Sequence, residues 1–530
     1  MPSLHDAHAL IKYPQRAPCK QPAPSTGEAS HAWFWSMQDL ILALDQGTTS
    51  TRAIVFDAGL RAIASAQIPL AQHYPHPGWV EHDLDEIWHA AQEVCRQAIA
   101  AVGGPHRIAA IGITNQRETT AIWDRRTGAA LHRAIVWQDR RTAAQCDGLR
   151  AQEPWVQSQS GLLLDPYFSA TKMAWLLDHV PGARLRAEHG EIALGTIDAF
   201  LIWHLTGGRV LVTDPSNASR TSLLALDSLD WSPDLAKLFG IPLAALPKLA
   251  PSAGLLGETD PGLFGAALPI AGMAGDQQAA LIGHSCFRAG EAKATFGTGC
   301  FLLAHTGDRP QPSHQRLLTS IGYRQPQSRA YVLEGSIFSS GASMQWLRDG
   351  LGLLENVQES EAIAAALPDN GGVYLVPAFA GLGAPQWQAG ARGAIFGLTR
   401  DTRAAHLVRA GLEACAFQAH DLIQAFAADG AAIAEPLRVD GGLSGNSWAM
   451  QFLADILDME ILRPAFQEMT ALGAARLAMV GAGLARRLED TPDNGLAPRR
   501  FAPKLGQSAR AALLAGWQAA VAGVLTNAHP

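Results

Sequence analysis

The stretch ILALDQGTTSTRAIVFD, residues 41–57, changes character twice. An apolar run ends at Asp45, the small and hydroxyl residues 47–50 follow, and the chain is apolar again at residues 53–56. This alternation predicts a β-hairpin. Its tip has two interpretations: an ordinary Asp-Gln-Gly turn with a solvated acid, or a loop whose backbone N–H groups and hydroxyls bind phosphate.

A second stretch of the same form, KATFGTGCFLLAH, occupies residues 293–305. It also has a strand-like run, a turn of Gly and Thr, and another apolar run. Two such hairpins in two halves of the chain suggest a duplicated phosphate clamp, although their sequences barely match. The glycine-bounded P-loop and the protein-kinase glycine loop are both absent from the sequence, so phosphate binding would have to use another fold.

The rest of the chain alternates short strands with amphipathic helices, which indicates an α/β class. Residues 402–429 have the apolar spacing of one long helix. Residues 436–457 indicate a strand, a glycine-rich loop and a helix, an arrangement suited to phosphate or ribose. A chain of 530 residues is too long for one core, and we divide it into domains at residues 37–285 and 286–530.

The bulk composition suits a soluble globular protein, with 48% hydrophobic and 17% charged residues. The net charge of −7 gives no electrostatic reason to expect nucleic acid or an anionic membrane as partner. Six scattered cysteines without a CxxC pair favour a reduced, cytoplasmic protein. Apolar windows are too short for a membrane span, and residues 509–525 are expected to be a packed terminal helix.

The first 36 residues carry five prolines and lack both a sustained period and the apolar core of a signal peptide. We expect them to be a disordered extension or a start-site artefact, with translation beginning at Met37; a targeting role is the alternative.

Two aspartates are candidates for phosphoryl transfer, which needs a phosphate cradle, Mg²⁺ and a base near the acceptor hydroxyl. Asp45 could position Mg²⁺ through water at the end of its strand. Asp276, in GMAGDQQAAL (272–281), could act as a general base in a glycine-lined cleft. A helix N-cap is the alternative for Asp276, and the residues by themselves favour it. For Asp45 the metal site and the solvated acid remain equally open.

The motif ITNQRETT, residues 113–120, contains a candidate pair for a small polyol. Arg117 and Glu118 would point to opposite faces of a strand, but both can converge at a strand-to-loop bend. A donor and an acceptor side by side would bind hydroxyl groups, and Trp137 and Tyr167 could wall the carbon skeleton. The alternatives are a surface ion pair and core aromatics.

Twelve motifs in order resemble the FGGY family of carbohydrate kinases, and within it the members that phosphorylate glycerol. The resemblance covers about residue 38 to the C-terminus and rests on the motifs LDQGTTSTR, PGWVEHD, ITNQRETT, IVWQDRRT, DPYFSATKMAW, DPSNASRT, AGDQQAAL, GTGCF, GASMQWLRD, PAFAGLGAP, ARGAIFGLTR and RVDGG. It implies an actin-like ATPase (ribonuclease H-like) fold with two α/β domains about a central cleft. The first domain would bind glycerol and phosphate, and the second the nucleotide.

The resemblance also implies roles for individual residues. Asp276 would be the general base, and Asp45 and Asp276 would position Mg²⁺ through water. Glycerol would be bound by Arg117, Glu118, Tyr167, Asp276 and Gln277, with Trp137 and Phe301 against its carbons. The nucleotide would be bound by Thr48, Thr49, Ser50, Arg52, Thr298, Gly341, Gln345, Gly442, Leu443, Asn446 and Ser447. After RVDGG the stretch LSGNSWAMQF departs from the family pattern, which puts the detailed adenine contacts in question.

The implied activity is transfer of the γ-phosphoryl group of MgATP to glycerol, giving sn-glycerol 3-phosphate, in a homodimer or homotetramer. Two alternatives remain: a kinase of the same family acting on another small polyol or dihydroxyacetone, and an actin-like protein that binds nucleotide without catalysis. Retention of Asp45, Asp276, Arg117 and Glu118 argues against the second.

Overall fold

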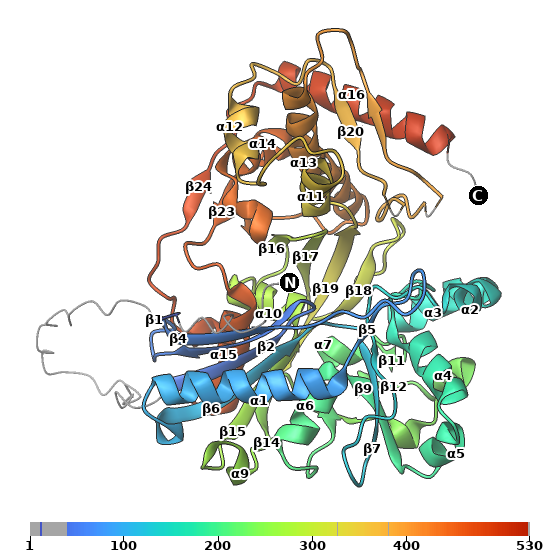
Figure 1. Cartoon of the computed structure of the whole chain (residues 1–530), viewed down its shortest axis with the longest axis vertical. Coiled ribbons are helices and arrows are strands. Elements are labelled where there is room, and N and C mark those ends of the chain that lie inside the picture. Colours follow the sequence, from blue (N-terminus) through green and yellow to red (C-terminus); the bar gives the residue numbers. More distant parts are fainter. Residues whose placement is uncertain (1–10, 13–39, 326, 380, 389, 528–530) are drawn as a thin grey trace, which may run out of the picture.

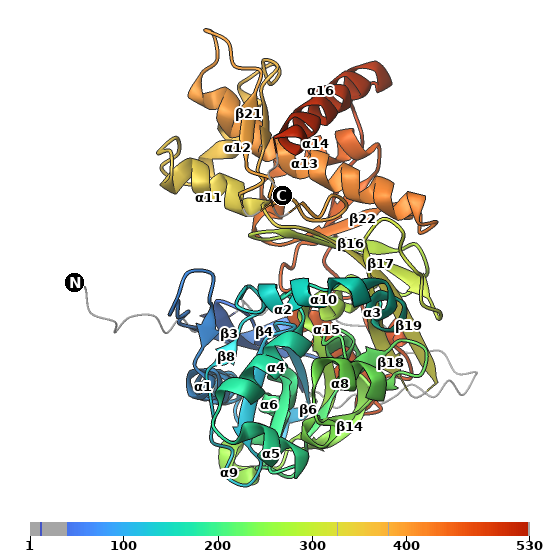
Figure 2. The ribbon, with the colours of Figure 1, turned by 90° about the vertical axis from the view of Figure 1, so that its right-hand side faces the viewer.

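The computed structural model describes residues 11–12, 40–325, 327–379, 381–388 and 390–527. They form two α/β domains, each built around a seven-stranded sheet (Figures 1 and 2). The predicted two-domain α/β architecture is confirmed.

The proposed N-terminal extension, residues 1–36, lies outside the described residues except for one short strand. Strand β1 (Ile11–Lys12) pairs antiparallel with β4 (Ala62–Pro69) at the edge of the N-terminal sheet.

The N-terminal sheet has the order β1-β4-β3-β2-β6-β15-β14, with β2, β6 and β15 parallel at its centre. Its remaining strands are β2 (Leu40–Gln46), β3 (Ser50–Phe56), β6 (Ile108–Asn115), β14 (Ala253–Glu258) and β15 (Pro269–Gly275). The predicted hairpin of residues 41–57 is confirmed, since β2 and β3 pair antiparallel along their whole length.

Alternate residues of β2 face two different cores, which explains why the strand is continuously apolar. Leu42 packs in a cluster with α1 (Leu84–Ala101), whereas Ile41 packs in a cluster with α15 (Met469–Gly481). The two helices therefore cover opposite faces of the sheet (Figure 1).

Helix α15 belongs to the C-terminal half of the sequence but covers the N-terminal sheet and packs against α10 (Asp276–Gly283). Glycines make the close approach possible: a Cβ on Gly473 would lie 1.8 Å from the carbonyl oxygen of Ala279. The two halves of the sequence are thus joined by helix packing as well as by the linking chain.

Further elements complete the N-terminal domain. A four-stranded sheet contains β5 (Glu81–His82), β7 (Thr120–Asp124), β8 (Ala134–Ile135) and β9 (Ile192–Thr196), and two short pairs contain β10 (Val212–Thr213) with β13 (Lys248–Leu249) and β11 (Leu224–Ala225) with β12 (Asp230–Trp231). The helices are α2 (Ala143–Gly148), α3 (Glu153–Ser160), α4 (Ser169–His179), α5 (Ala183–Glu188), α6 (Ile197–Leu205), α7 (Pro215–Ala218), α8 (Pro233–Phe239) and α9 (Pro261–Phe264).

The C-terminal sheet has the order β18-β19-β17-β16-β22-β23-β24. Its strands are β16 (Ala292–Phe296), β17 (Cys300–Gly307), β18 (Leu318–Gln325), β19 (Ser328–Ile337), β22 (Leu437–Asp440), β23 (Ile461–Arg463) and β24 (Arg499–Phe501). Strands β20 (Tyr374–Val376) and β21 (Ala394–Phe396) form a separate pair, and the helices are α11 (Gly341–Asp349), α12 (Glu359–Ala365), α13 (Ala404–Ala428), α14 (Ser447–Leu457) and α16 (Gln507–Thr526). The second predicted hairpin, the long helix and the strand–loop–helix are confirmed as β16–β17, α13 and β22–α14.

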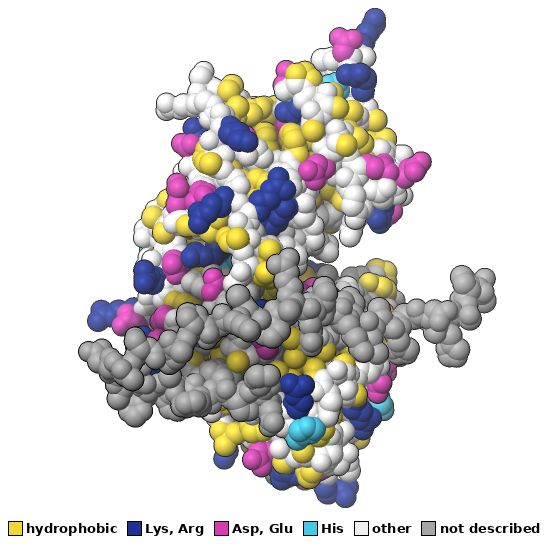
Figure 3. Space-filling model, turned by 90° about the vertical axis from the view of Figure 1, so that its left-hand side faces the viewer, with side chains coloured by type: hydrophobic (Ala, Val, Ile, Leu, Met, Phe, Trp, Pro, Cys, Tyr) yellow, Lys and Arg dark blue, Asp and Glu magenta, His cyan; other side chains and the backbone are white. Residues whose placement is uncertain are grey.

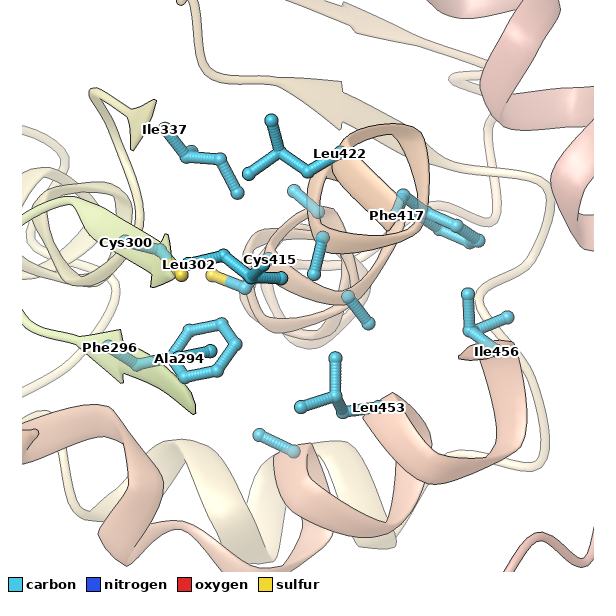
Figure 4. Packing of buried hydrophobic residues seen from close by; sticks show 14 of the residues in the cluster. Ala294, Phe296, Cys300, Leu302, Ile337, Cys415, Phe417, Leu422, Leu453 and Ile456 are labelled. Atoms are coloured by element: carbon cyan, nitrogen blue, oxygen red, sulfur yellow. The ribbon is translucent and has the colours of Figure 1, made fainter. Parts of the chain in front are cut away.

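The C-terminal core surrounds α13 (Figure 4). Phe417 of α13 lies among side chains from α14, and Cys415 faces Cys300 and Phe296 of the sheet. The five cysteines among the described residues are buried and free. On the part of the described surface that Figure 3 shows, basic and acidic side chains are interspersed.

The predicted terminal helix is present as α16 and packs by one face. Trp517 stacks on Phe417 with ring centroids 5.3 Å apart, and its Nε1 donates to Asp421 at 2.8 Å. Among the described residues, α16 is the one helix that could cross a membrane by length and composition, with a mean hydropathy of 1.2.

Candidate active site

Both predicted hairpins reach the same tryptophan. Trp137 Nε1 donates to Thr48 Oγ1, at the tip of β2–β3, over 3.0 Å. The Trp137 ring also lies edge-on to Phe301, next to the tip of β16–β17, with centroids 6.1 Å apart. Two loops that are about 250 residues apart in the sequence therefore meet at one indole, as expected of a two-part clamp.

The first tip is held by polar contacts that leave its hydroxyls near solvent. Gly47 N–H donates to the Ser50 carbonyl at 2.9 Å, and the Ser50 hydroxyl accepts from Gln67 at 2.9 Å. Gln67 in turn accepts from Arg52, which also pairs with Glu468. Thr49 is exposed. The candidate phosphate-binding residues thus cluster at the β2–β3 turn, at one end of these strands. They are Thr48, Thr49, Ser50 and Arg52.

Two carboxylates, Asp45 at the end of β2 and Asp276 at the start of α10, interact electrostatically. Burial, together with the negative charges of Asp276 and Glu468, raises the pKa of Asp45 to about 7. Burial also raises the pKa of Asp276, against the opposing effect of Arg117. The N-cap alternative for Asp276 is wrong, because Gly275 is the N-cap of α10 and Asp276 is its first helical residue.

Arg117 and Glu118 converge just beyond the end of β6. Glu118 has a φ of 58°, which turns the chain at the strand end. Arg117 Nε lies 3.8 Å from Glu118 Oε1 and 3.4 Å from Asp276 Oδ1. Both residues are buried, at 3% and 1% exposure, so the surface ion-pair alternative is wrong.

Two further charged residues complete this cluster, and sequence reasoning missed both. Glu334 of β19 accepts from Arg117, and Arg220 donates to Glu118 at 2.6 Å and to Glu334 at 3.1 Å. The four side chains form a buried ring of alternating charge. Arg117 and Arg220 lower the pKa of Glu334 to about 2 despite its burial. DPSNASRT was a recognised motif containing Arg220, but no local signal pointed to Glu334.

Aromatic rings and an amide border this charged ring. The Tyr167 hydroxyl accepts from Arg117 Nη2 at 3.4 Å, and the Tyr167 ring lies 5.7 Å from that of Trp137. Gln277 accepts from Lys293, a buried residue of β16 that sequence reasoning also missed. The candidate glycerol-binding residues Arg117, Glu118, Tyr167, Asp276, Gln277, Trp137 and Phe301 are therefore gathered in one place.

The second hairpin tip packs against the start of α11. The Thr298 carbonyl accepts from Ser340 and Ala342, and a Cβ on Gly341 would lie 2.5 Å from the Gly297 carbonyl oxygen. Only glycine fits there without movement of the tip. Gln345, one turn further along α11, is exposed.

The last nucleotide-binding candidates lie on the loop after β22. A Cβ on Gly442 would meet no atom within 4 Å, so the backbone there is accessible, whereas Leu443 is buried. Asn446 caps α14 by accepting from Ala449 N–H at 2.9 Å, and the Ser447 hydroxyl accepts from Arg499. These two side chains already have structural partners, in the stretch that departs from the family pattern.

A divalent cation fits the carboxylate pair. The described residues contain no group of three or more His, Cys, Asp and Glu side chains placed to hold a metal. Mg²⁺ needs fewer protein ligands, since it keeps several waters and binds through one or two carboxylates and substrate phosphates. The negative charge of Asp276 raises the pKa of Asp45, and a cation bound near both carboxylates would offset this repulsion.

Two domains of one known protein family match most of the chain. The N-terminal domain of the FGGY family of carbohydrate kinases matches residues 40–283, and the C-terminal domain of the same family matches residues 292–482. The chain belongs to this family.

This FGGY kinase is similar to proteins named glycerol kinase. It is 58% identical to one from Rhodospirillum centenum over 484 residues, covering 91% of this chain and 97% of that protein. It is 52% identical to one from Gluconobacter oxydans over 497 residues, covering 93% and 97%. A crystal structure of Plasmodium falciparum glycerol kinase with ADP aligns with a TM-score of 0.86 at 35% identity, covering 92% of this chain and 98% of that one. The two-domain kinase fold expected from the sequence is thereby confirmed.

Proposed function

We propose that this protein transfers the γ-phosphoryl group of ATP to glycerol, giving sn-glycerol 3-phosphate. The observation that carries the proposal is the position of Asp276, 3.4 Å from Arg117, in a cluster of charged side chains bordered by aromatic rings. A base, a hydroxyl-binding ion pair and an apolar wall are what a small polyol acceptor needs. Relatives at 52–58% identity bear the name glycerol kinase.

Glycerol would bind with its hydroxyls between Arg117 and Glu118 and its carbons against Trp137, Tyr167 and Phe301. The charged ring holds Arg117 and Glu118 rigidly, so the acceptor meets preorganised groups and little ordering is required on binding. A longer sugar would need the volume that the Arg117 side chain occupies.

Asp276 would take the proton of the attacking hydroxyl. The new bond forms between that oxygen and the γ-phosphorus, the bond from the γ-phosphorus to the β–γ bridging oxygen breaks, and ADP leaves with the electron pair. The raised pKa of Asp276 makes it a better proton acceptor than an ordinary carboxylate.

The two hairpin tips would hold the phosphates of ATP, with Thr48, Thr49, Ser50 and Arg52 on one side and Thr298 on the other. The rest of the nucleotide would lie along Gly341, Gln345, Gly442 and Leu443. Asn446 and Ser447 would border it. Asp45 and Asp276 would hold Mg²⁺ through water, where the ion would offset the negative charge of the phosphates.

A coupled assay of ADP release tests the proposal. Turnover should require both glycerol and ATP, and catalytic efficiency should be higher with glycerol than with erythritol, pentitols or dihydroxyacetone. Better efficiency with one of the other acceptors would overturn the choice of substrate. ATP binding without turnover on any acceptor would instead favour a non-catalytic nucleotide-binding protein.

A further inference from the structure

A cavity of about 400 Å³ lies away from the candidate active site. Its walls include Ser285 and Phe287 from the segment after α10, Arg476 of α15, and Thr491 and Asp493 after the turn Leu488–Asp490. Asp276 lies at the beginning of α10 and this cavity lies beyond its end. The cavity therefore occupies the joint where the chain passes from one domain to the other.

Arg476 is the decisive residue of this cavity. It is only 3% exposed, and its Nε has no hydrogen-bond partner among the described residues. Its Nη1 donates to Ser285 Oγ at 2.7 Å, and its Nη2 reaches the Pro492 carbonyl only at 3.4 Å. The Nε–Nη2 edge is thus the weakly used one, and this edge of a guanidinium matches a carboxylate with two parallel hydrogen bonds.

A buried guanidinium with an unsatisfied N–H is costly unless a ligand completes it. Burial lowers the pKa of Arg476 to about 10, and nearby Asp493 opposes this shift. The group remains charged at neutral pH, so an oxyanion is the ligand that it favours.

The other charged residues of the cavity indicate which charges the ligand should carry. Glu291 is already occupied, because it accepts from the backbone of Phe287 and Arg288 and from Arg438. Glu489, Asp493 and Arg288 also line the cavity. The two carboxylates balance the guanidinium groups of Arg288 and Arg476, so a ligand with no net charge, which carries one positive and one negative group, fits this lining better than a doubly charged anion such as phosphate.

We propose that this cavity binds a small free amino acid. Its carboxylate would lie on the Nε–Nη2 edge of Arg476, and its ammonium group beside Glu489 and Asp493. Ser285 and Thr491 offer hydroxyls for the same polar groups, and the partly buried Phe287 offers an apolar wall for the side chain. The site is separate from glycerol and ATP, so it stands whether or not the proposed function holds.

Calorimetric titration of the full chain with glycine, alanine, serine and leucine tests the proposal, with lactate and inorganic phosphate as comparison probes. At least one amino acid should bind and raise the Tm. Lactate, which has a hydroxyl in place of the ammonium group, should bind about tenfold more weakly than alanine. Failure of every amino acid to bind, or equal binding of phosphate, would overturn the proposal.

Two variants locate the site. Arg476→Gln should abolish binding, and Asp493→Asn should weaken alanine binding about tenfold while leaving lactate binding unchanged. Arg487→Gln is the matched control, because Arg487 pairs with Asp490 in the same turn but is 68% exposed. If Arg476→Gln fails to fold, the Asp493→Asn comparison still decides. Alanine binding that is unchanged in Asp493→Asn contradicts the assignment.

Discussion

Glu334 accepts hydrogen bonds from both terminal nitrogens of Arg117, at 2.6 Å from Nη1 and 3.0 Å from Nη2, although 217 residues separate them in the sequence. Both side chains are at most 2% exposed. A β-strand of the C-terminal sheet thereby positions a candidate polyol-binding residue of the N-terminal domain, so we expect acceptor binding to depend on how the two parts are joined.

Replacing Glu334 by Gln should raise the KM for glycerol at least tenfold while lowering kcat less. The amide cannot hold both Arg117 and Arg220, so Arg117 loses its fixed position. Breaking a buried ion pair also costs about 3–5 kcal/mol of stability. Steady-state kinetics and urea unfolding measure the two effects.

The matched control is Glu460→Gln. Glu460 also accepts twice from an arginine, Arg500, but that arginine is 62% exposed, so the loss should stay below about 1 kcal/mol. A Glu334→Gln enzyme with unchanged KM would show that Arg117 needs no such support.

Replacing Asp276 by Asn should lower kcat by about 10²–10⁴-fold while glycerol binding is retained. The amide keeps the shape of the side chain and loses the proton acceptor. Turnover and the glycerol Kd from calorimetry separate the two effects. Asp349→Asn, at an exposed ion pair with Arg348, should leave both values unchanged. Wild-type turnover in Asp276→Asn would refute the base assignment.

Asp45 should make stability depend on pH. Its folded pKa of about 7 lies above the ordinary value of 3.8, so the folded state holds the proton more tightly than the unfolded state. This contribution to the free energy of unfolding therefore falls as the pH rises from about 4 to 7. Without ligands, Asp45→Asn should be more stable than the wild type at pH 8, by up to about 4 kcal/mol for a pKa raised from 3.8 to about 7, and the difference should vanish near pH 4.

Mg²⁺ provides a second readout for Asp45. In the wild type, Mg²⁺ at pH 8 should relieve the repulsion between Asp45 and Asp276 and raise the Tm, and this rise should be smaller in Asp45→Asn. Thermal scans with and without Mg²⁺ measure it. Equal Mg²⁺ effects in both proteins would place the ion elsewhere.

Gly473→Ala should destabilise the joint between the domains. A methyl group there would lie 1.8 Å from the Ala279 carbonyl oxygen, so α10 and α15 would have to separate. Overpacking of this kind costs about 1–3 kcal/mol or more, and the displaced α10 should also lower kcat through Asp276. Gly148→Ala is the control, because it ends α2 with no atom within 4 Å of the added carbon. A normal Tm in Gly473→Ala would mean that the helices can move apart freely.

Local features were predictable from sequence because their causes are local. The hairpins of residues 41–57 and 293–305 follow from apolar runs about a glycine turn, and α13 follows from its helical period. Arg117 and Glu118 could be recognised as a pair because they are adjacent at a strand end.

The long-range partners could not be predicted in this way. Glu334 stands in an ordinary apolar strand and Lys293 at the start of another, so neither has a local sign of its contact with the active site. The capping role of Asn446 and the return of α15 to the N-terminal sheet likewise depend on which elements pack together.

The sequence by itself determined the two α/β domains, the two glycine turns and the candidates for metal, base and polyol binding, since each depends on neighbouring residues. Only the tertiary structure decided how these candidates are held. Burial removed water from Arg117, Glu118, Arg220 and Glu334, so each charge needed a partner, and the packing of two sheets supplied it.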